Sequence, residues 1–270
     1  MALTLSVLCD NNTLIDRYYY GEPAVSYYIE IDGARILFDT GYSDVFLKNA
    51  VLMDVDLSAI THLVISHGHD DHTRGLPFLS ERHTFTHVPL ICHPHCFAPR
   101  WAGELYVGPP MPEEMPTHFD YQPSCTPVWL TENCVFLGEI PTTHAFEPRH
   151  KMGTVRLNGQ LQDDYMLDDS ALCCRTDHGL FIITGCSHSG ICNIISHAQQ
   201  VCGDTRIAGV IGGFHLLEMN DRVRHTIDYL AALGTNCRRI PCHCVSLHVK
   251  AAMLQAFDFE EIGSGTIIHM

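Results

Sequence analysis

The sequence has little positive charge and no long apolar run. Sixteen lysine and arginine residues stand against 31 aspartate and glutamate residues in a chain of 270, which leaves a formal net charge of −15. Nucleic-acid binding depends on basic patches that neutralise phosphates, so this composition disfavours a nucleic-acid partner. No apolar run approaches the roughly 20 residues that a membrane-spanning helix needs, and we expect no membrane partner.

Signals of export and of disulfide pairing are also missing. The first ten residues show neither a basic leader nor a small-residue cleavage site, and the 13 cysteines are odd in number and irregularly spaced. We therefore expect reduced thiols and a cytoplasmic location. The sequence also lacks the G-x-S-x-G elbow that would carry a serine nucleophile.

The apolar patterning predicts an α/β fold in one domain, residues 1–270. With 46% hydrophobic residues the chain can bury a large core. Two strand-rich halves, each followed by helices, indicate two packed sheets with helices outside. We expect strands at 3–8, 25–31, 35–38, 61–66, 89–93, 134–138, 171–175, 180–184, 207–211, 239–241 and 266–268, and helices at 43–52, from 72, at 191–202, 223–231 and 246–256.

Residues 97–127 differ from the rest of the chain because they are rich in proline. The segment holds Pro99, Pro109, Pro110, Pro112, Pro116, Pro123 and Pro127. This density excludes long helices and central strands. We interpret the segment as an extended surface insertion that serves as a lid or substrate wall; a disordered insertion is the alternative.

The strongest chemical signal is a cluster of metal-ligand side chains directly after the predicted strand at 61–66. His67, His69, Asp71 and His72 fall within six residues. Residues two apart point to the same side of an extended chain, so His67 and His69 can hold one metal while Asp71 and His72 face a neighbouring position. Imidazole and carboxylate suit zinc, iron or manganese. Gly68 allows the sharp turn that the cluster needs. The alternative is a solvated polar loop.

Three later histidines have a similar setting, where a strand ends beside glycine: His188, His215 and His243. We predict that His188 and His243 are metal ligands, and we leave His215 open between ligand and structural residue. Asp39 ends another strand, and we predict that it accepts the second ring N–H of a metal-bound histidine. Its alternative role is to cap a turn.

A further cluster, Cys92-His93-Pro94-His95-Cys96, is too crowded and too interrupted by proline to close around one ion. We predict that His93 and His95 line the approach to the main site, with a structural metal as the alternative.

The pattern H-x-H-x-D-H over residues 67–72 resembles the signature of the metallo-β-lactamase superfamily. Within it, the chain is similar to the branch named 7,8-dihydropterin-6-methyl-4-(β-D-ribofuranosyl)aminobenzene 5′-phosphate synthase, which is linked to pterin and methanopterin biosynthesis. The similarity rests on residues 10–12, 37–41, 66–72, 184–191, 212–216 and 241–244, and residues 168–172 also fit either this branch or a turn before a strand. The resemblance implies a metallo-β-lactamase-like αββα sandwich of two mixed sheets.

The resemblance also implies a division of the ligands into two sites. One metal would be held by His67, His69 and His188, and the other by Asp71, His72 and His243. Many relatives bridge the two metals with a carboxylate from the segment that matches residues 207–215. Here that segment has no aspartate or glutamate, and His215 takes the expected position.

A second departure concerns phosphate recognition. Relatives tend to place arginine directly after Pro141, where this chain has Thr142. Since arginine is the residue best shaped to clamp a phosphate, its absence weakens the case for the phosphate substrate in the branch's name.

These observations predict a metal-dependent hydrolase or transferase that acts on a small phosphorylated or pterin-like molecule through a metal-bound hydroxide. Two divalent ions are expected as cofactors, zinc first, with iron or manganese as alternatives. Asp71 would orient the hydroxide and take a proton, and His215 or His144 would donate one to the leaving group.

Two alternative functions remain at this stage: a di-iron redox protein, and a metal- or ligand-binding protein of the same fold without turnover. We expect no flavin domain, because the sequence ends almost at the last predicted strand, and this expectation counts against a redox protein. A small-molecule substrate is the expected partner, and the sequence leaves a homo-oligomer open.

Overall fold

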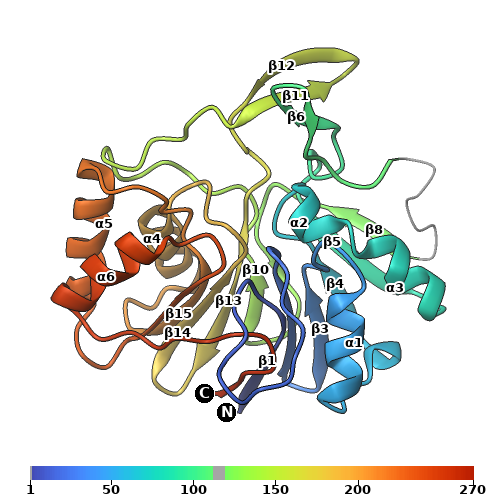
Figure 1. Cartoon of the computed structure of the whole chain (residues 1–270), viewed down its shortest axis with the longest axis horizontal. Helices are drawn as coiled ribbons and strands as arrows, with labels where there is room; N and C mark the ends of the chain where they lie inside the picture. The colour runs from blue at the N-terminus through green and yellow to red at the C-terminus, as the bar shows by residue number, and fades with distance from the viewer. Residues whose placement is uncertain (1, 112–118) are drawn as a thin grey trace.

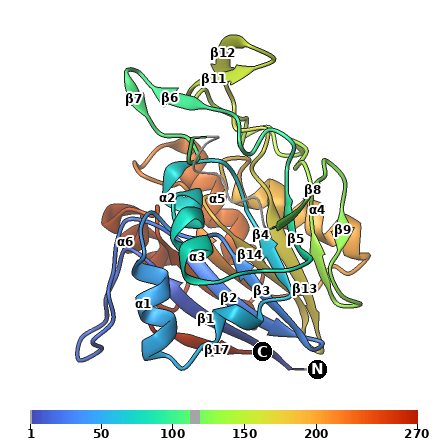
Figure 2. The same cartoon turned by 90° about the vertical axis from the view of Figure 1, so that its right-hand side faces the viewer.

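Two mixed β-sheets face each other, and helices cover the outer face of each (Figures 1 and 2). The structure is a computed structural model, and it describes residues 2–111 and 119–270. The predicted α/β sandwich is confirmed. The first and last strands pair with each other, so the two chain ends lie together at one end of the sandwich (Figure 1).

The first sheet has seven strands in the order β17-β1-β2-β3-β4-β5-β8. Its antiparallel half contains the Asp32-Gly33 turn, where both residues have positive φ as a tight hairpin requires. From β3 onwards the strands run parallel. The strands are β1 (Leu3–Cys9), β2 (Ser26–Ile31), β3 (Ala34–Phe38), β4 (His62–Val64), β5 (Val88–Cys92), β8 (Phe119–Pro123) and β17 (Ile267–His269).

The second sheet has six strands in the order β16-β15-β14-β13-β10-β9, and β14, β15 and β16 run parallel. Parallel strands end at the same edge of their sheet, so the segments that follow them are brought together. The strands are β9 (Val128–Trp129), β10 (Cys134–Phe136), β13 (Ala171–Thr176), β14 (Gly179–Thr184), β15 (Ile207–Gly213) and β16 (Arg238–Cys242).

Apolar side chains fill three layers. Phe38 and Phe136 belong to the layer between the two sheets. Ile194 and Leu230 pack in the layer between the second sheet and its helices, and Phe46 packs beneath the helices of the first sheet. All five side chains are completely buried. Burial of this extent contributes roughly 1.5–3 kcal/mol for each large side chain, which fixes the strand ends that carry the polar loops.

The helices agree with the sequence prediction, with small differences at their ends. Helix α1 begins at Val45 after Asp44 rather than at a Ser43 cap, although the Ser43 hydroxyl still accepts the Val45 N–H at 3.3 Å. Side chains cap α5 and α6, because Asn220 and Ser246 each accept a backbone N–H of the first turn. The helices are α1 (Val45–Leu52), α2 (Asp70–Thr73), α3 (Leu76–Arg82), α4 (Ile191–Cys202), α5 (Asp221–Ala232) and α6 (Leu247–Ala256), with a 3-10 turn η1 (Leu57–Ala59).

A third, four-stranded sheet projects above the sandwich at the end opposite to the chain termini (Figure 1). It consists of β6 (Arg100–Ala102), β7 (Leu105–Tyr106), β11 (Gly153–Leu157) and β12 (Gln160–Asp164). The sequence pattern did not predict this sheet. The Asn158-Gly159 turn, with positive φ at both residues, was the available signal for its hairpin.

The proline-rich segment 97–127 therefore contains regular structure that the prediction of an extended loop did not include. It supplies β6 and β7 to the small sheet and β8 to one edge of the first sheet. The prolines are compatible with these strands because β8 lies at an edge and Pro123 is its last residue. Residues 112–118 lie outside the described part, and the role of the segment as a lid stays a prediction.

Two further features concern compartment and redox state. In the described part of the chain, no helix combines the length and apolar character needed to cross a membrane. All 13 cysteines belong to that part and are free thiols.

Candidate metal centre

The predicted ligands follow the ends of the parallel strands in both sheets. Asp39 follows β3, the 67–72 cluster follows β4, His188 follows β14, His215 follows β15 and His243 follows β16. Backbone hydrogen bonds continue past the strand ends, from Asp39 N–H to the Val64 carbonyl and from Gly213 N–H to the Gly185 carbonyl, each at 2.9 Å. The loops are therefore held by the sheets, and their side chains meet at one edge of the sandwich.

The first group of ligand atoms belongs to His67, His69 and His188. One nitrogen of each ring lies within 4.8 Å of the others, and His67 Nε2 is 3.2 Å from His69 Nδ1. Burial lowers the pKa of His69 to about 3, and burial followed by the neighbouring imidazoles holds the pKa of His67 and His188 well below the usual range of histidine. All three rings are therefore neutral at pH 7, which is the form that binds metal.

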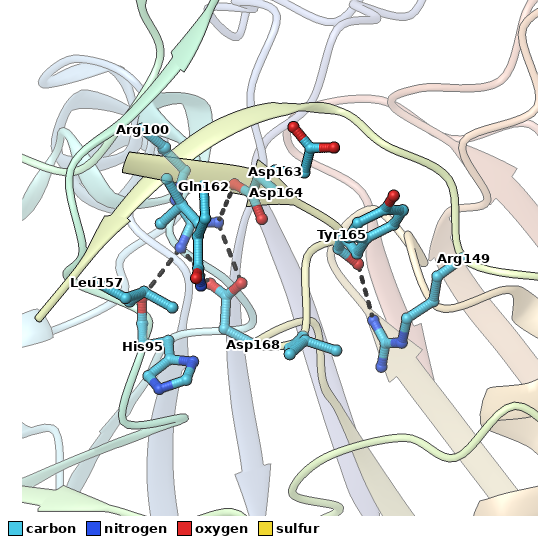
Figure 3. Close-up of a pocket in the computed structure, with 11 residues that line it drawn as sticks. His95, Arg100, Arg149, Leu157, Gln162, Asp163, Asp164, Tyr165 and Asp168 are labelled. Carbon is cyan, nitrogen blue, oxygen red and sulfur yellow. Dashed lines mark hydrogen bonds and ion pairs between the residues drawn. The ribbon is translucent and has the colours of Figure 1, made fainter. Parts of the chain in front are cut away.

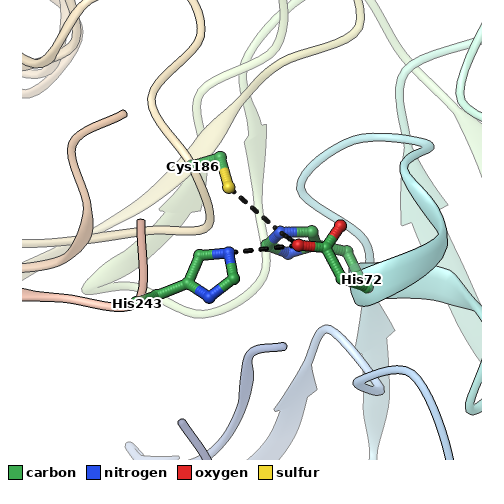
Figure 4. Close-up of side chains that lie close together, drawn as sticks. His72, Cys186 and His243 are labelled. Atoms are coloured by element: carbon green, nitrogen blue, oxygen red, sulfur yellow. Dashed lines mark hydrogen bonds and ion pairs between the residues drawn. The ribbon is translucent and has the colours of Figure 1, made fainter. Parts of the chain in front are cut away.

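The second group belongs to Asp71, His72, Cys186 and His243 (Figure 4). Asp71 Oδ2 lies 3.6 Å from His72 Nε2 and 3.2 Å from His243 Nε2. Burial alone would raise the pKa of Asp71, but His72 and His243 hold it below its usual range, so the carboxylate is ionised at neutral pH. Burial alone would lower the pKa of His72, but Asp71 and Asp39 together raise it to about 9.

Both groups fit divalent ions of the zinc type by their donor chemistry, because imidazole, carboxylate and thiolate are the ligands such ions prefer. His188 supports this independently. It is 6% exposed, and neither ring nitrogen has a hydrogen-bond partner among the described residues. A buried polar group without a partner costs about 1–3 kcal/mol unless an ion or water completes it. The two groups adjoin, since the ring centroids of His67 and His72 are 4.1 Å apart.

Asp39 links the two groups through hydrogen bonds. It is completely buried, and its Oδ2 accepts hydrogen bonds from His72 Nδ1 and from the Ser66 hydroxyl, each at 2.7 Å. Its Oδ1 accepts the Ser66 N–H at 2.7 Å. The Ser66 oxygen is in turn 2.9 Å from His67 Nδ1. This network assigns a proton to Nδ1 in both rings, as we predicted for one histidine. His67 Nε2 is then free, whereas His72, with its pKa of about 9, carries a second proton on Nε2 at neutral pH that a metal would displace.

Asn11 and Asp10 play the same role for His243, and the sequence analysis noted them only as part of a family resemblance. His243 Nδ1 donates to Asn11 Oδ1 at 2.7 Å, which leaves Nε2 facing Asp71. Asp10 Oδ2 accepts the backbone N–H of His243 at 3.1 Å. No local pattern joins residues 10–11 to residue 243; they meet because the first sheet, which carries β1, packs on the second, which carries β16.

The loop that carries the first ligands rests on a buried ion pair. The Arg100 guanidinium contacts both carboxylate oxygens of Asp168 at 3.1 Å, and Asp168 Oδ2 also accepts the Gly68 N–H at 2.8 Å. A Cβ at Gly68 would meet the Cys96 carbonyl oxygen at 1.8 Å. Gly68 is therefore required by a close approach of backbone to backbone, rather than by the sharp turn that we expected.

Of the remaining predicted residues, His215 lies beside the first ligand group and His144 lies against helices α4 and α5. The His215 ring packs against His188, with centroids 4.4 Å apart, and burial lowers its pKa to about 4. His215 belongs to neither group of ligand atoms among the described residues. The His144 ring packs against Tyr229 and its Nε2 is 2.8 Å from the Ser196 hydroxyl. The His144 ring also packs against Phe146, and its backbone N–H donates to Asn193 of α4.

Within the Cys92–Cys96 cluster the His93 and His95 rings stay in contact, with centroids 5.0 Å apart. His93 Nε2 also lies 3.3 Å from Cys125 Sγ and 3.4 Å from Glu139, two residues from distant parts of the chain. His95 lines a cavity near the small sheet. The two cysteines are buried.

Two cavities lie beside the centre. One of about 380 Å³ is open to His69, Asp70 and Asp71, with Pro23, Tyr42, Ala102, Val107 and Met152 as its other walls. The second, of about 250 Å³, lies under the β11–β12 hairpin (Figure 3). Both arginines that line this cavity already have hydrogen-bond partners. Arg100 donates to Asp168, and Arg149 donates to the backbone carbonyls of Ile140 and Met166. The first cavity is the one that is lined by a member of each ligand group, His69 and Asp71.

Comparison with known proteins gives a consistent picture. Residues 19–114 match the profile of the Metallo-beta-lactamase superfamily. The chain is 30% identical over 268 residues to the 7,8-dihydropterin-6-methyl-4-(beta-D-ribofuranosyl)-aminobenzene-5'-phosphate synthase of Methanocaldococcus jannaschii, with 93% of this chain and 90% of that protein covered. An uncharacterized protein of the same organism is 27% identical over 266 residues, which cover 96% of this chain and 98% of that one.

Solved structures agree. Tm1679, a metal-dependent hydrolase of the beta-lactamase superfamily, superposes with a TM-score of 0.82 at 28% identity, over 98% of each chain. Zn²⁺-bound PqqB from Methylobacterium extorquens shares the fold, with a TM-score of 0.55 at 12% identity over 98% of this chain and 99% of that one. The chain therefore belongs to the metallo-β-lactamase superfamily and, within it, resembles the dihydropterin-ribofuranosyl-aminobenzene phosphate synthase.

Proposed function

We propose that the protein is a metal-dependent hydrolase or transferase that acts on a small phosphorylated or pterin-like molecule. The observation that carries the proposal is the pair of adjoining ligand groups beside an open cavity of about 380 Å³. His67, His69 and His188 would hold one divalent ion, and Asp71, His72 and His243 would hold the other. When bound, two ions of the zinc type supply Lewis acidity and make water a nucleophile near neutral pH.

Asp71 is placed to orient the nucleophile. It lines the cavity, and its carboxylate is ionised at neutral pH because His72 and His243 hold its pKa low. An ionised carboxylate accepts hydrogen bonds, so Asp71 can align an attacking water toward a substrate in the cavity. Its low pKa makes it a weak proton acceptor, and we assign it orientation as its main role.

His215 is a better candidate than His144 for assisting the leaving group. The His215 ring packs on His188, a member of the first ligand group. With a pKa of about 4 it is neutral at pH 7, so it would act as a hydrogen-bond donor through its N–H rather than as an imidazolium acid. His144 already shares a hydrogen bond with Ser196, and we assign it a structural role.

The walls of the cavity support the proposed substrate class. Val107 and Met152 give one side an apolar character, which suits a flat heterocycle. Tyr42 forms another wall, and the Arg74 guanidinium lies 4.8 Å from its ring and donates to its hydroxyl at 2.6 Å. Arg74 is exposed at this rim, so it can contribute the positive charge that Thr142 does not.

The test combines metal analysis with a substrate screen. The purified protein, loaded with zinc or manganese, is incubated with phosphate mono- and diesters, cyclic phosphodiesters and reduced pterin derivatives, and products are followed by mass spectrometry. We expect turnover of at least one class that disappears in His67→Ala and on chelation, whereas His87→Ala, which changes an exposed histidine, retains it. A protein that is folded but binds no metal contradicts the proposal.

A further inference from the structure

One member of the second group, Cys186, was not among the ligands expected from the sequence. Its Sγ lies 3.2 Å from His72 Nε2, and Figure 4 shows the thiol directed at the histidine pair. The side chain is 3% exposed. Its sulfur is within 4.8 Å of the ligand atoms of Asp71, His72 and His243, so the four donors surround one position.

The separations between these donors match those around a single tetrahedral ion. Bonds of about 2.0–2.3 Å to nitrogen, oxygen and sulfur place neighbouring ligands about 3.3–3.8 Å apart. The distances are 3.2 Å from Cys186 to His72, 3.6 Å from His72 to Asp71 and 3.2 Å from Asp71 to His243. The group therefore needs only small adjustments to close around an ion.

Cys186 also supplies charge where the chain lacks it. The segment 207–215 contains no aspartate or glutamate, and so provides no bridging carboxylate. Asp71 alone would leave the second ion with one anionic ligand. We propose that Cys186 is a thiolate ligand of the second metal and takes the place of the missing carboxylate. This assignment rests on the proposed function, in which the second group holds a metal.

The surroundings hold the sulfur in this position. A Cβ at Gly185 would meet the Ser66 hydroxyl at 2.3 Å, so the loop packs directly on the network of Asp39. The Ser187 hydroxyl donates to the Gly213 carbonyl at 2.7 Å, which fixes the other side of Cys186. The Cys244 thiol lies 3.3 Å from the Cys186 sulfur and closes this side of the loop.

Cobalt(II) provides a test that does not depend on turnover. Thiolate coordination gives a sulfur-to-cobalt charge-transfer band in the near ultraviolet, whereas imidazole and carboxylate do not. The apoprotein, with its thiols kept reduced, is titrated with Co²⁺ alone. We expect two ions per chain and a charge-transfer band that appears with one of them. In Cys186→Ser the band disappears and the affinity for that ion falls by more than about 100-fold, beyond the effect of losing an outer hydrogen-bond partner.

Three variants keep the outcome clear. Cys192→Ser removes another buried thiol outside both ligand groups and should retain the band. Cys244→Ser should retain it as well. Cys186→Asp, which restores the charge with oxygen, should bind two cobalt ions without the band and covers the case in which Cys186→Ser does not fold.

Two results would overturn the assignment while leaving the proposed function standing. The first is binding of two cobalt ions to the wild-type protein without a charge-transfer band. The second is a band that survives in Cys186→Ser or Cys186→Asp, or that is lost in Cys244→Ser alone. A folded wild-type protein that binds no cobalt would overturn the proposed function and this assignment together.

Discussion

Replacing Asp39 with asparagine changes one oxygen for an NH₂ group at the point where the two ligand groups are joined. Asp39 has φ of +58°, a conformation that asparagine also adopts readily, so the backbone should not change. Its Oδ1 receives the Ser66 N–H, and its Oδ2 receives both His72 Nδ1–H and the Ser66 hydroxyl. Asparagine has one acceptor oxygen, which can serve either the Ser66 N–H or the pair formed by His72 Nδ1–H and the Ser66 hydroxyl, but not both.

The loss of one acceptor oxygen changes which ring nitrogen carries the proton in His72 and His67. If the asparagine oxygen stays with the Ser66 N–H, its NH₂ faces His72 Nδ1, and the ring must move its proton to Nε2, the atom directed at the second group. The Ser66 hydroxyl would then reverse and donate to His67 Nδ1, with the same consequence for the first group. A lost or opposed hydrogen bond of this kind costs about 1–3 kcal/mol. We expect metal affinity to fall about 10–100-fold.

Competition against a chromophoric chelator at pH 7 measures this affinity for both ions. Asp32→Asn is the matched control, because Asp32 also has positive φ and accepts hydrogen bonds, but lies in the turn between β2 and β3. Circular dichroism should show an unchanged fold in both variants. Affinities equal to those of the wild type would refute the assignment of the protons, and global unfolding of Asp39→Asn would show that its role is structural.

Four further results are expected. His188→Ala should reduce the metal content from two ions to about one by elemental analysis, since the first group keeps two of its three nitrogens. Burial alone would raise the pKa of Asp168, but the Arg100 guanidinium outweighs burial and holds this pKa below its usual range. The ion pair therefore contributes fully to the free energy of unfolding above about pH 4, and this contribution is lost as the pH falls through the lowered pKa. Asp168→Asn should destabilise the apoprotein by about 3–5 kcal/mol at pH 7 in denaturant unfolding, with a smaller difference in acid. Arg74→Ala should raise KM for a phosphorylated substrate about tenfold with little change in kcat, and an equal KM would remove Arg74 from the site. His215→Ala should keep both ions and lower kcat, whereas loss of the second ion would restore His215 as its ligand.

The parts of the site that could be predicted are those with a local signal. The spacing of residues 67–72 is visible in the sequence, and the strand that precedes it predicts where the cluster lies. His188 and His243 could be found because each follows an apolar run that ends beside glycine or cysteine. The hairpin of β11 and β12 was not predicted, although Asn158-Gly159 is a typical hairpin turn. The residues that flank this turn are mostly polar and show no clear strand pattern.

The rest depends on pairings between distant segments. Cys186 is one of 13 cysteines, and its one local signal is that it stands two residues before the predicted ligand His188. Its position beside His72 follows from the packing of one sheet on the other. The same holds for Asn11, which meets His243 across 232 positions of the chain. Side chains that orient a ligand carry no spacing rule of their own, so only the tertiary structure identifies them.

The chain of hydrogen bonds from His72 through Asp39 and Ser66 to His67 has a consequence for how two ions would load. One carboxylate positions the Nδ1 protons of a ring in each group, so both groups depend on the same proton arrangement. The affinities of the two ions would therefore be tied to one hydrogen-bond network. A change at Asp39 would weaken both ions together, whereas a change at Asn11, which accepts a hydrogen bond from His243, would weaken the second ion alone.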